Sequence, residues 1–512
     1  MSVALVGVDA RVVEVEVDVG AGIPEFTLAA LSDRVLKEAR HRVRAALTNS
    51  GEHWPIRRTT VALSPAVVPK SGSRFDVAIA VTLVAACGEL PPGALDEWVV
   101  LGELGLDGAV KPVTGVLPSV IGAYRAGRRR FVVPVGNLRE ASLVTDCRIV
   151  GVESLREMCA WLRGEIAPPS TVPVAAVAPS ADEPLDFRDV LGQPGARRGI
   201  EVAAAGGHHV LMSGPPGVGK TMIAERLPGI LPDLTDDEAL EVTGLHSIAG
   251  LLRDGAPLVT RPPFCAPHHT ASAAAVVGGG SGLAAPGAVS VANRGVLFLD
   301  EAPEFHPKVL DALREPVESG VVTLARSAGV VTYPARFLLV MAANPCPCSA
   351  GGGDGLRRGC VCPGAIRRTY RARISGPFRD RLDVMLDLDP VSRAALVTGA
   401  TAEHSAAIKE RVVAARERAR HRMRGTAWST NAQVPGPILR RRWPLPPSVL
   451  RPLHRQMDRG QLSTRGLDRV AKVSWTIADL ADRSQPGLDD VAEALSLRSG
   501  PWAGHADGAM SA

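Results

Sequence analysis

The sequence lacks an apolar run long enough to cross a membrane. Its longest apolar stretch, from Val77 to Cys87, is shorter than the roughly 20 residues that a bilayer span requires. The first residues also lack a basic segment followed by an apolar run, which is the pattern of a secretory signal. We therefore expect a cytoplasmic protein that has no membrane partner.

Cysteine is scarce, with eight residues among 512, so the chain is not a disulfide-stapled scaffold. Free thiols or a metal site explain these cysteines better than bridges do. Hydrophobic residues make up 46% and charged residues 22%, which is typical of globular proteins and excludes a disordered chain. At roughly 150 residues per domain, the length predicts about three domains.

The chain has no strong charge of either sign, because its net charge is only +5. The distribution is less even: the segment 401–455 holds 12 Lys and Arg but 3 Asp and Glu, a net charge of +9. This local excess suits nucleic acid or another polyanion. A solvated face of a helix explains it equally well.

Hydrophobic periodicity predicts the organisation of the chain. Alternation over 13–19 indicates a half-buried strand, and apolar residues at helical spacing indicate a helix over 33–49. A Pro-rich stretch without a core pattern predicts a linker. We expect an α/β domain at 1–164, the linker at 165–185, a parallel α/β core at 186–400, a helical region at 401–500 and a tail at 501–512. The helical region is expected to begin with a helix over 402–423 and to have helix caps near Ser463 and Gly487.

A phosphate-binding loop is the first chemical motif. It follows an apolar strand and opens a helix, and its residues are Gly214, Pro215, Pro216, Gly217, Val218, Gly219, Lys220 and Thr221. Glycine lets the backbone N–H groups turn towards phosphate oxygens, while Lys220 adds a positive charge for the β- and γ-phosphates. The hydroxyl of Thr221 suits Mg²⁺. The loop therefore predicts ATP and Mg²⁺ as cofactors.

Polar residues follow two further buried strands. Asp300 and Glu301 end the strand 295–299, where α/β sheets place ligands. Asp300 suits Mg²⁺, through water, and Glu301 suits deprotonation of an attacking water, so we expect hydrolysis. Asn344 ends the strand 337–343. It can contact the γ-phosphate or position water, or it can be a turn residue before Pro345.

Together with these motifs, several more specific stretches mark a resemblance. The sequence resembles the ComM/YifB-like branch of the magnesium-chelatase-type AAA+ ATPases over nearly its whole length. The matching stretches are 186–193, the loop at 214–221, the Pro-His-His element within 261–270, 295–304, the Asn-Pro-Cys-Pro-Cys element at 344–348, and 374–377. The resemblance implies a central AAA+ P-loop domain with a parallel sheet and a C-terminal helical lid.

The resemblance also implies roles in a ring of subunits, usually a hexamer, with ATP bound at the interfaces. Asn344 matches the sensor-1 position and Arg465 matches sensor 2 in the lid. Arg381 matches the arginine finger that reaches the γ-phosphate of the neighbouring subunit. The family commonly has an uncharged residue where this chain has Arg379, so either arginine can be the finger, and we favour Arg381.

Two insertions in the core are expected by comparison with related motors. The Gly-rich stretch 278–282 predicts an inserted mobile loop, and 321–336 predicts a hairpin that turns at 327–329. Such inserts line the central pore in related motors, so Arg326 is a candidate for gripping a DNA strand. The other interpretation is a pair of solubilising loops. His268 and His269 lie in the first insert, and we do not expect both to bind one metal ion.

Four of the eight cysteines lie close together, as two Cys-x-Cys pairs that a Gly-rich loop separates. They are Cys346, Cys348, Cys360 and Cys362. Four thiolates satisfy tetrahedral Zn²⁺, so we favour a structural zinc site over free thiols or a redox switch. The cluster lies between the Asn344 strand and the finger segment, where a metal would brace the catalytic geometry.

The N-terminal region resembles the ribosomal-S5-like domain that also underlies Lon-type proteases. Arg74 stands where the Lon nucleophilic serine is expected, and the place of the catalytic lysine, near 115–117, is apolar. Ser71 and Ser73 lie nearby, but a serine nucleophile requires an adjacent base. We therefore expect a binding or assembly module without protease activity.

The function implied by the resemblance is a ring motor that hydrolyses ATP and drives branch migration when incoming DNA is recombined. A DNA partner without sequence preference agrees with this, because phosphate contacts dominate nucleic-acid affinity. The alternative is a chelatase-like motor subunit that remodels a partner protein. A third possibility is a scaffold that uses ATP only as an assembly switch, which Asp300, Glu301 and Arg381 argue against.

Overall fold

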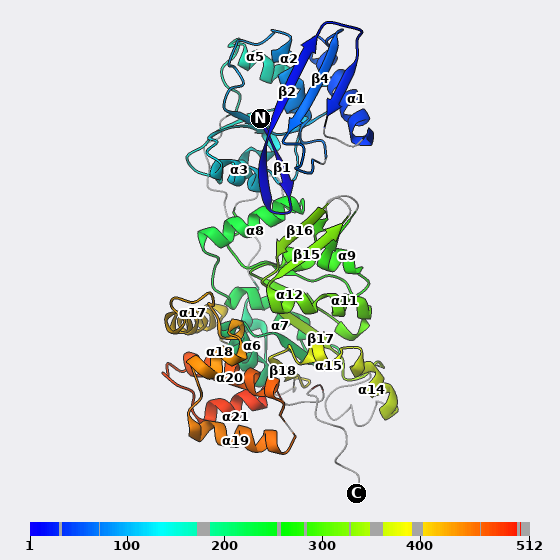
Figure 1. Ribbon diagram of the computed structural model, residues 1–512. Coiled ribbons are helices and arrows are strands. Elements are labelled where there is room, and N and C mark those ends of the chain that lie inside the picture. Colours follow the sequence, from blue (N-terminus) through cyan, green and yellow to red (C-terminus); the bar gives the residue numbers. More distant parts are fainter. Residues whose placement is uncertain are drawn as a thin grey trace.

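The computed structural model describes most of the chain, in three tiers that follow the sequence from the N-terminal to the C-terminal end (Figure 1). The described residues are 1–29, 33–70, 72–170, 185–252, 258–280, 284–326, 329–348, 362–391, 403–460, 462–498 and 502. Ser71, Cys360, most of the expected linker and nearly all of the expected tail lie outside them.

The N-terminal tier has a four-stranded sheet in the order β1-β2-β4-β3. Its elements are β1 (Ser2–Val6), β2 (Asp9–Gly20), β3 (Phe26–Ala29), β4 (Arg58–Ser64), α1 (Asp33–Ser50) and α2 (Asp76–Ala86). The predicted strand over 13–19 lies within β2, and the predicted helix over 33–49 is α1. Both predictions are confirmed, and the apolar side of β2 packs against a core that includes Val13, Val61 and Ile79.

A second part of this tier is built around the parallel sheet β5-β8-β9. Its elements are β5 (Trp98–Val100), β6 (Glu103–Leu104), β7 (Val110–Lys111), α3 (Val116–Arg125), β8 (Arg130–Pro134), α4 (Leu138–Ala141), β9 (Arg148–Val152) and α5 (Leu155–Leu162). The side chain of Ser154 caps α5 by accepting a hydrogen bond from the backbone N–H of Glu157.

The central tier has a five-stranded parallel sheet in the order β11-β14-β17-β10-β18. Its strands are β11 (Phe264–Cys265), β14 (Val296–Leu299), β17 (Leu338–Ala343), β10 (Val210–Ser213) and β18 (Val384–Asp387). The residues of β10, β14 and β17 are all buried, as expected for strands covered on both faces. This is a parallel α/β fold, as expected, in which β10, β14 and β17 carry the predicted site residues at their carboxyl ends.

Short helices surround this sheet. They are α6 (Pro194–Gly206), α7 (Lys220–Arg226), α8 (Asp236–Ile248), α9 (Ala273–Val277), α10 (Ala288–Val291), α11 (Pro307–Ala312), α12 (Arg314–Ser319), α14 (Gly364–Ala372) and α15 (Gly376–Arg379). Single 3₁₀ turns occur here and elsewhere: η1 (Val135–Asn137), η2 (Phe187–Asp189), η3 (Leu227–Ile230), η4 (Ala302–Glu304) and η6 (Asn431–Gln433).

Both expected insertions have regular structure. The hairpin over 321–336 is formed by β15 (Val321–Arg326) and β16 (Gly329–Pro334), with the turn at 327–328 outside the described residues. At its start the glycine stretch 278–282 differs from the expected mobile loop, because β12 (Gly278–Gly279) pairs with β13 (Ala285–Pro286); residues 281 and 282 lie outside the described residues. A Cβ atom at Gly278 would lie 2.8 Å from the carbonyl oxygen of Ala285, so glycine here permits close pairing of two strands.

The C-terminal tier is helical, as expected. It contains α17 (Ser405–Arg422), α18 (Gly436–Arg442), α19 (Pro447–Asp458), α20 (Thr464–Leu480) and α21 (Leu488–Ser496). The side chain of Ser463 caps α20 by accepting a hydrogen bond from the N–H of Gly466, and Gly487 is the N-cap of α21. Both predicted caps are confirmed.

The basic segment 401–455 lies in this tier, and five of its cations form ion pairs with described carboxylates. These pairs are Lys409–Asp233, Arg411–Glu201, Arg418–Asp482, Arg422–Asp479 and Arg440–Asp468. Arg416 donates two hydrogen bonds to the carbonyl oxygen of Ala204 in α6. Much of the local charge therefore joins helices, and less of it is left for a polyanion than the net +9 implies.

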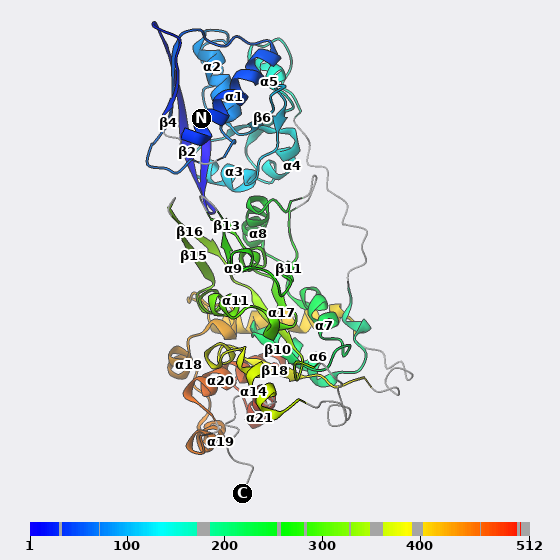
Figure 2. The same ribbon diagram turned by 90° about the vertical axis from the view of Figure 1, so that its right-hand side faces the viewer.

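The N-terminal tier rests on the central tier at two places (Figures 1 and 2). The turn between β1 and β2 reaches the hairpin β15–β16, where Val6 and Val8 pack against a core that includes Val331. The helix α3 packs against α8. There the backbone N–H of Gly115 donates to the carbonyl oxygen of Ser247 (3.1 Å), and the hydroxyl of Ser247 donates to Glu140 (2.6 Å).

Candidate functional site: a phosphate loop at the edge of the parallel sheet

The phosphate loop joins β10 to α7 at the carboxyl edge of the sheet. Gly217 and Gly219 have φ angles of +80° and +95°, which favour glycine. A Cβ atom at Gly214 would lie 2.6 Å from the carbonyl oxygen of Leu388, so the start of the loop also requires glycine. Pro215 and Val218 are buried, whereas Pro216 and Gly217 are exposed, so the loop opens to solvent at its tip.

Lys220 lies beneath this loop and is almost fully buried. Its ammonium group donates to the carbonyl oxygens of Gly214 (2.5 Å) and Pro215 (2.9 Å). It also donates to Oδ1 of Asn344 at 3.1 Å, which places the end of β17 directly beside the loop. Burial lowers the pKa of Lys220, and the carboxylates of Asp300 and Glu301 oppose that shift.

Asp300 and Glu301 follow β14 at the same edge. The hydroxyl of Thr221 donates to Oδ2 of Asp300 at 2.9 Å, so these two oxygens face one location. Oxygen ligands of this kind suit Mg²⁺, which keeps several waters and takes one or two protein ligands. Glu301 has a positive φ of +50°, and its exposed carboxylate stands at the mouth of the site. The structure thus brings together Lys220, Thr221, Asp300, Glu301 and Asn344.

Two further residues reach this edge, although the sequence did not indicate that they would lie here. The imidazole Nδ1 of His269 lies 3.5 Å from Oε2 of Glu301, so the Pro-His-His element touches the acidic end of β14. Gln193 has a φ of +54°, and its amide donates to the carbonyl oxygens of Val218 (3.5 Å) and Asp389. The Pro-His-His element was visible in the sequence, but its contact with Glu301 depends on tertiary packing.

The two candidate finger arginines lie away from this cluster. Arg381 pairs with Glu318 of α12 (2.8 Å) and donates to the carbonyl oxygen of Pro377 (2.6 Å). Arg379 donates to the carbonyl oxygen of Trp502 at 3.5 Å. Arg465 is exposed in the first turn of α20. None of the three has a contact with the phosphate loop among the interactions of the described residues.

Three of the four clustered cysteines are described. The Sγ atoms of Cys346, Cys348 and Cys362 lie within 4.8 Å of one another, and those of Cys346 and Cys348 are 3.1 Å apart. Cys360 lies outside the described residues. The cluster joins the end of β17 to the start of α14, and this proximity suits a shared metal ion.

Arg326 is exposed at the end of β15. Alternation places Val322 and Tyr333 on the buried face of the hairpin, while Thr323, Ala325 and Thr332 are exposed on the other face. The hairpin thus offers one free face to a partner. His268 is exposed and donates or accepts a hydrogen bond with Thr270 (2.8 Å).

The segments that resemble the Lon catalytic region also lie together. Arg74 donates to the carbonyl oxygen of Thr114 (2.9 Å) and to the hydroxyl of Ser119 (3.4 Å), beside the apolar residues 116 and 117. Burial lowers the pKa of Arg74 to about 10. The hydroxyl of Ser73 donates to Glu103.

Family models of magnesium chelatase match three stretches of the chain. A model of magnesium chelatase subunit ChlI matches residues 186–396, a second model for this subunit matches 15–137, and a model of its C-terminal part matches 402–498. Competence protein ComM of Haemophilus influenzae is 39% identical over 97% of this chain and 96% of its own. The chain belongs to the ComM/YifB-like, magnesium-chelatase-type AAA+ family.

Two other similar proteins show how far the likeness extends. YifB of Escherichia coli is 40% identical over 97% of this chain and 96% of its own. The magnesium-chelatase 38 kDa subunit of Rhodobacter capsulatus is 26% identical but matches only 34% of this chain and 56% of its own. Among the described residues of this ComM/YifB-like protein, no helix has the length and apolarity to span a membrane.

Proposed function

We propose that this protein is an ATP-hydrolysing ring motor that moves DNA strands. The observation that carries the proposal is a pair of contacts at one edge of the sheet. Lys220 contacts Asn344 at 3.1 Å, and Thr221, the next residue, contacts Asp300 at 2.9 Å. A lysine charge, a polar amide and two hard oxygens in one place are suited to a nucleoside triphosphate and its metal ion. Family membership supports the ATPase part of this proposal.

In the proposed mechanism each residue acts on the phosphates or on water. The loop from Gly214 to Thr221 holds the phosphates, with Lys220 neutralising their charge. Thr221 and Asp300 would hold Mg²⁺, which neutralises charge that develops during transfer. Glu301 orients and deprotonates the attacking water, and Asn344 positions that water or the γ-phosphate.

Arg381 is proposed to complete the site of a neighbouring subunit. Arg381 lies between α15 and β18, where its side chain is 17% exposed and pairs with Glu318, and it has no contact with the phosphate loop of its own chain among the described residues. A finger supplied by the neighbour makes hydrolysis depend on assembly and can contribute about 10³- to 10⁵-fold in rate. Arg465 is proposed to contact nucleotide from the lid. The number of subunits is proposed to be six by family resemblance.

Fewer observations support the DNA part of the proposal. Arg326 and the free face of the hairpin β15–β16 can contact a phosphate backbone, and exposed arginines such as Arg441 and Arg451 add charge. The full-length likeness to ComM supports a motor of that kind, acting in branch migration during recombination of incoming DNA. The competing function is a chelatase-like motor that remodels a partner protein, but the chelatase subunit resembles only a third of this chain.

The experiment that tests the proposal is ATP turnover with and without single-stranded, duplex and forked DNA. We expect DNA to raise the rate in the wild-type protein and Arg326→Ala to weaken that stimulation without changing turnover in the absence of DNA. The matched control is Arg459→Ala, an exposed arginine outside the basic segment. An ATPase that none of the three DNA forms stimulates would favour the chelatase-like function instead.

A further inference from the structure

The residues directly after Arg381 form backbone hydrogen bonds with distant parts of the chain. The backbone N–H groups of Asp383 and Val384 both donate to the carbonyl oxygen of His209, at 3.0 and 3.1 Å. Arg498, which follows α21, donates to the carbonyl oxygens of Leu382 (2.7 Å) and Asp383 (3.1 Å). These four backbone groups therefore have partners from distant parts of the chain.

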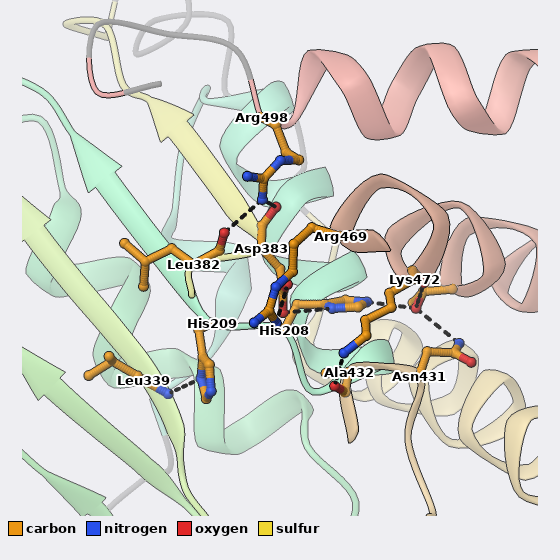
Figure 3. Close-up of polar contacts among 11 residues, drawn as sticks. His208, His209, Leu339, Leu382, Asp383, Asn431, Ala432, Arg469, Lys472 and Arg498 are labelled. Atoms are coloured by element: carbon orange, nitrogen blue, oxygen red, sulfur yellow. Dashed lines mark hydrogen bonds and ion pairs between the residues drawn. The ribbon is translucent and has the colours of Figure 1, made fainter. Parts of the chain in front are cut away.

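The side chain of Asp383 is fully buried and is the centre of a polar network (Figure 3). One carboxylate oxygen accepts a hydrogen bond from Nη1 of Arg469 in α20 at 2.9 Å. The other lies 3.2 Å from Nδ1 of His208. Burial raises the pKa of the carboxyl, but Arg469, His208 and Lys472 outweigh burial and hold that pKa well below its usual range.

The network continues into the helical tier. Nε2 of His208 lies 2.7 Å from the hydroxyl of Thr476 in α20, which also accepts from Asn431 at 3.0 Å. Asn431 in turn donates to Asp479 at 2.8 Å. Asp383 thus connects the finger segment to two turns of α20, the helix whose first turn carries Arg465.

The same network reaches the phosphate loop through β10. His208 and His209 immediately precede β10, whose other end leads into the loop at Gly214. Nδ1 of His209 accepts a hydrogen bond from the backbone N–H of Leu339 in β17, the strand that ends before Asn344. Two adjacent histidines therefore connect the finger segment to β10 and β17, two of the three strands that lead to the site.

We propose that Asp383, His208 and Arg469 are positioning residues that fix the finger segment, so that Arg381 meets the nucleotide of the neighbouring subunit. This inference rests on the proposed ring function. A guanidinium contributes fully to phosphoryl transfer only when the backbone segment that carries it is held within a fraction of an ångström of the productive geometry. A charge at the centre of the network selects one arrangement of lid and core, since any other arrangement leaves a buried ion without its partners.

The test uses mixed rings, because they separate a defect in the finger from a defect in the subunit's own site. Arg469→Gln removes the charge that faces Asp383 and keeps the phosphate loop. We expect this variant to assemble and to bind ATP with an affinity near that of the wild type, while turnover falls between about 10- and 100-fold. The matched control, Arg459→Gln, changes an exposed arginine and should leave turnover unchanged.

Mixing partners then identify the defect. Glu301→Gln subunits lack the general base but keep an intact finger, so mixing them with Arg469→Gln subunits should restore activity. Arg381→Ala subunits lack the finger, so mixing them with Arg469→Gln subunits should restore nothing. Three results would overturn the inference. Arg381→Ala subunits alone could restore activity, neither partner could restore it, or Arg469→Gln could show full turnover by itself.

Two further measurements keep the test decisive. Asp383→Asn has nearly the same shape as the wild-type side chain and retains hydrogen-bonding groups, so it gives the same mixing test if Arg469→Gln does not fold. Mixing Glu301→Gln with Arg381→Ala is the reference, since it tests the trans finger by itself. If that reference pair regains activity and the Arg469→Gln pair does not, only the positioning role fails; if the reference pair also fails, the trans finger itself is wrong.

Discussion

Lys220 and Glu301 serve the same site from different surroundings, so their loss should affect different steps. Lys220 is buried under the loop and its charge is directed at the phosphates, whereas Glu301 is exposed at the mouth. We expect Lys220→Ala to abolish ATP binding. We expect Glu301→Gln to keep binding but to slow hydrolysis by roughly 10²- to 10⁴-fold, the usual contribution of a general base.

Equilibrium binding of a fluorescent ATP analogue and steady-state phosphate release separate the two effects. Lys308→Ala, which changes an exposed lysine in α11, is the control for loss of a lysine elsewhere in the core. Turnover of Glu301→Gln equal to that of the wild type would show that Glu301 is not the base.

His209 should make the stability of the core depend on pH. Burial lowers the pKa of His209 to about 4, and its Nδ1 already accepts a hydrogen bond from the backbone N–H of Leu339. The unfolded chain, with a histidine pKa of about 6.5, binds more protons between these values, so stability falls as pH drops from 6.5 towards 4. The expected loss between pH 7 and pH 5 is up to about 2 kcal/mol.

Denaturant unfolding at several pH values measures this effect. His209→Gln keeps an acceptor for the N–H of Leu339 but cannot be protonated, so it should remove this part of the pH dependence. His454→Gln, at an exposed position in α19, should leave the dependence unchanged. Equal pH dependence in wild type and His209→Gln would contradict the assignment.

At the scale of single residues, the sequence predicted the roles that depend on local spacing. Lys220 and Asp300 stand 80 positions apart, yet each has its own recognisable pattern, a glycine loop before a helix and a carboxylate after an apolar strand. The partners of Asp383 were not predictable, because Arg469 and His208 lie 86 and 175 positions away. Only tertiary packing shows that these polar residues are buried together.

At the scale of elements, the end of β17 and the start of α14 are joined by the cysteine cluster. Three Sγ atoms within 4.8 Å, with Cys360 as the predicted fourth ligand, suit one Zn²⁺. We expect about one zinc per chain in protein purified without added metal, and its loss in Cys348→Ser or Cys360→Ser. Elemental analysis measures this. Cys87→Ser, far from the cluster in sequence, should keep the metal, and a wild-type protein that is active without zinc would contradict a structural site.

Elements with strong local signals were predicted, and those that depend on distant partners were not. A small-residue turn at 327–329 within 321–336 predicted the hairpin β15–β16. The glycine stretch at 278–282 looked like a loop, because no local signal shows that Gly278 and Gly279 pair with β13. In α17 the arginines suited a solvated basic face, yet Arg411 pairs with Glu201 of α6 and Arg422 pairs with Asp479 of α20.

At the scale of the whole molecule, the N-terminal tier contacts the ATPase core through the turn that contains Gly7. A Cβ atom at Gly7 would lie 2.6 Å from Cγ1 of Val331 and 3.2 Å from the carbonyl oxygen of Thr332. The β1–β2 turn therefore lies directly on the hairpin that carries Arg326. A binding or assembly role for this tier agrees with such a contact and stays a prediction.

Gly7→Ala should destabilise this contact between tiers. Gly51→Ala is a matched control, because both glycines have positive φ angles (+68° and +86°) but a Cβ atom at Gly51 meets nothing within 4 Å. Both variants carry the cost of a left-handed alanine, about 1 to 2 kcal/mol. Overpacking should make Gly7→Ala lower the free energy of unfolding by at least about 1 kcal/mol more. Equal losses in denaturant unfolding would show that the turn is not packed on the hairpin.

The central claim is that ATP hydrolysis at this site moves DNA strands, and strand exchange on a branched DNA measures it most directly. A fluorescently labelled four-way or forked substrate reports the release of one strand as the branch moves. The account predicts release by the wild-type protein with ATP and Mg²⁺, and none by Glu301→Gln under the same conditions. Rapid ATP hydrolysis by the wild-type protein without release from any of these substrates would contradict it.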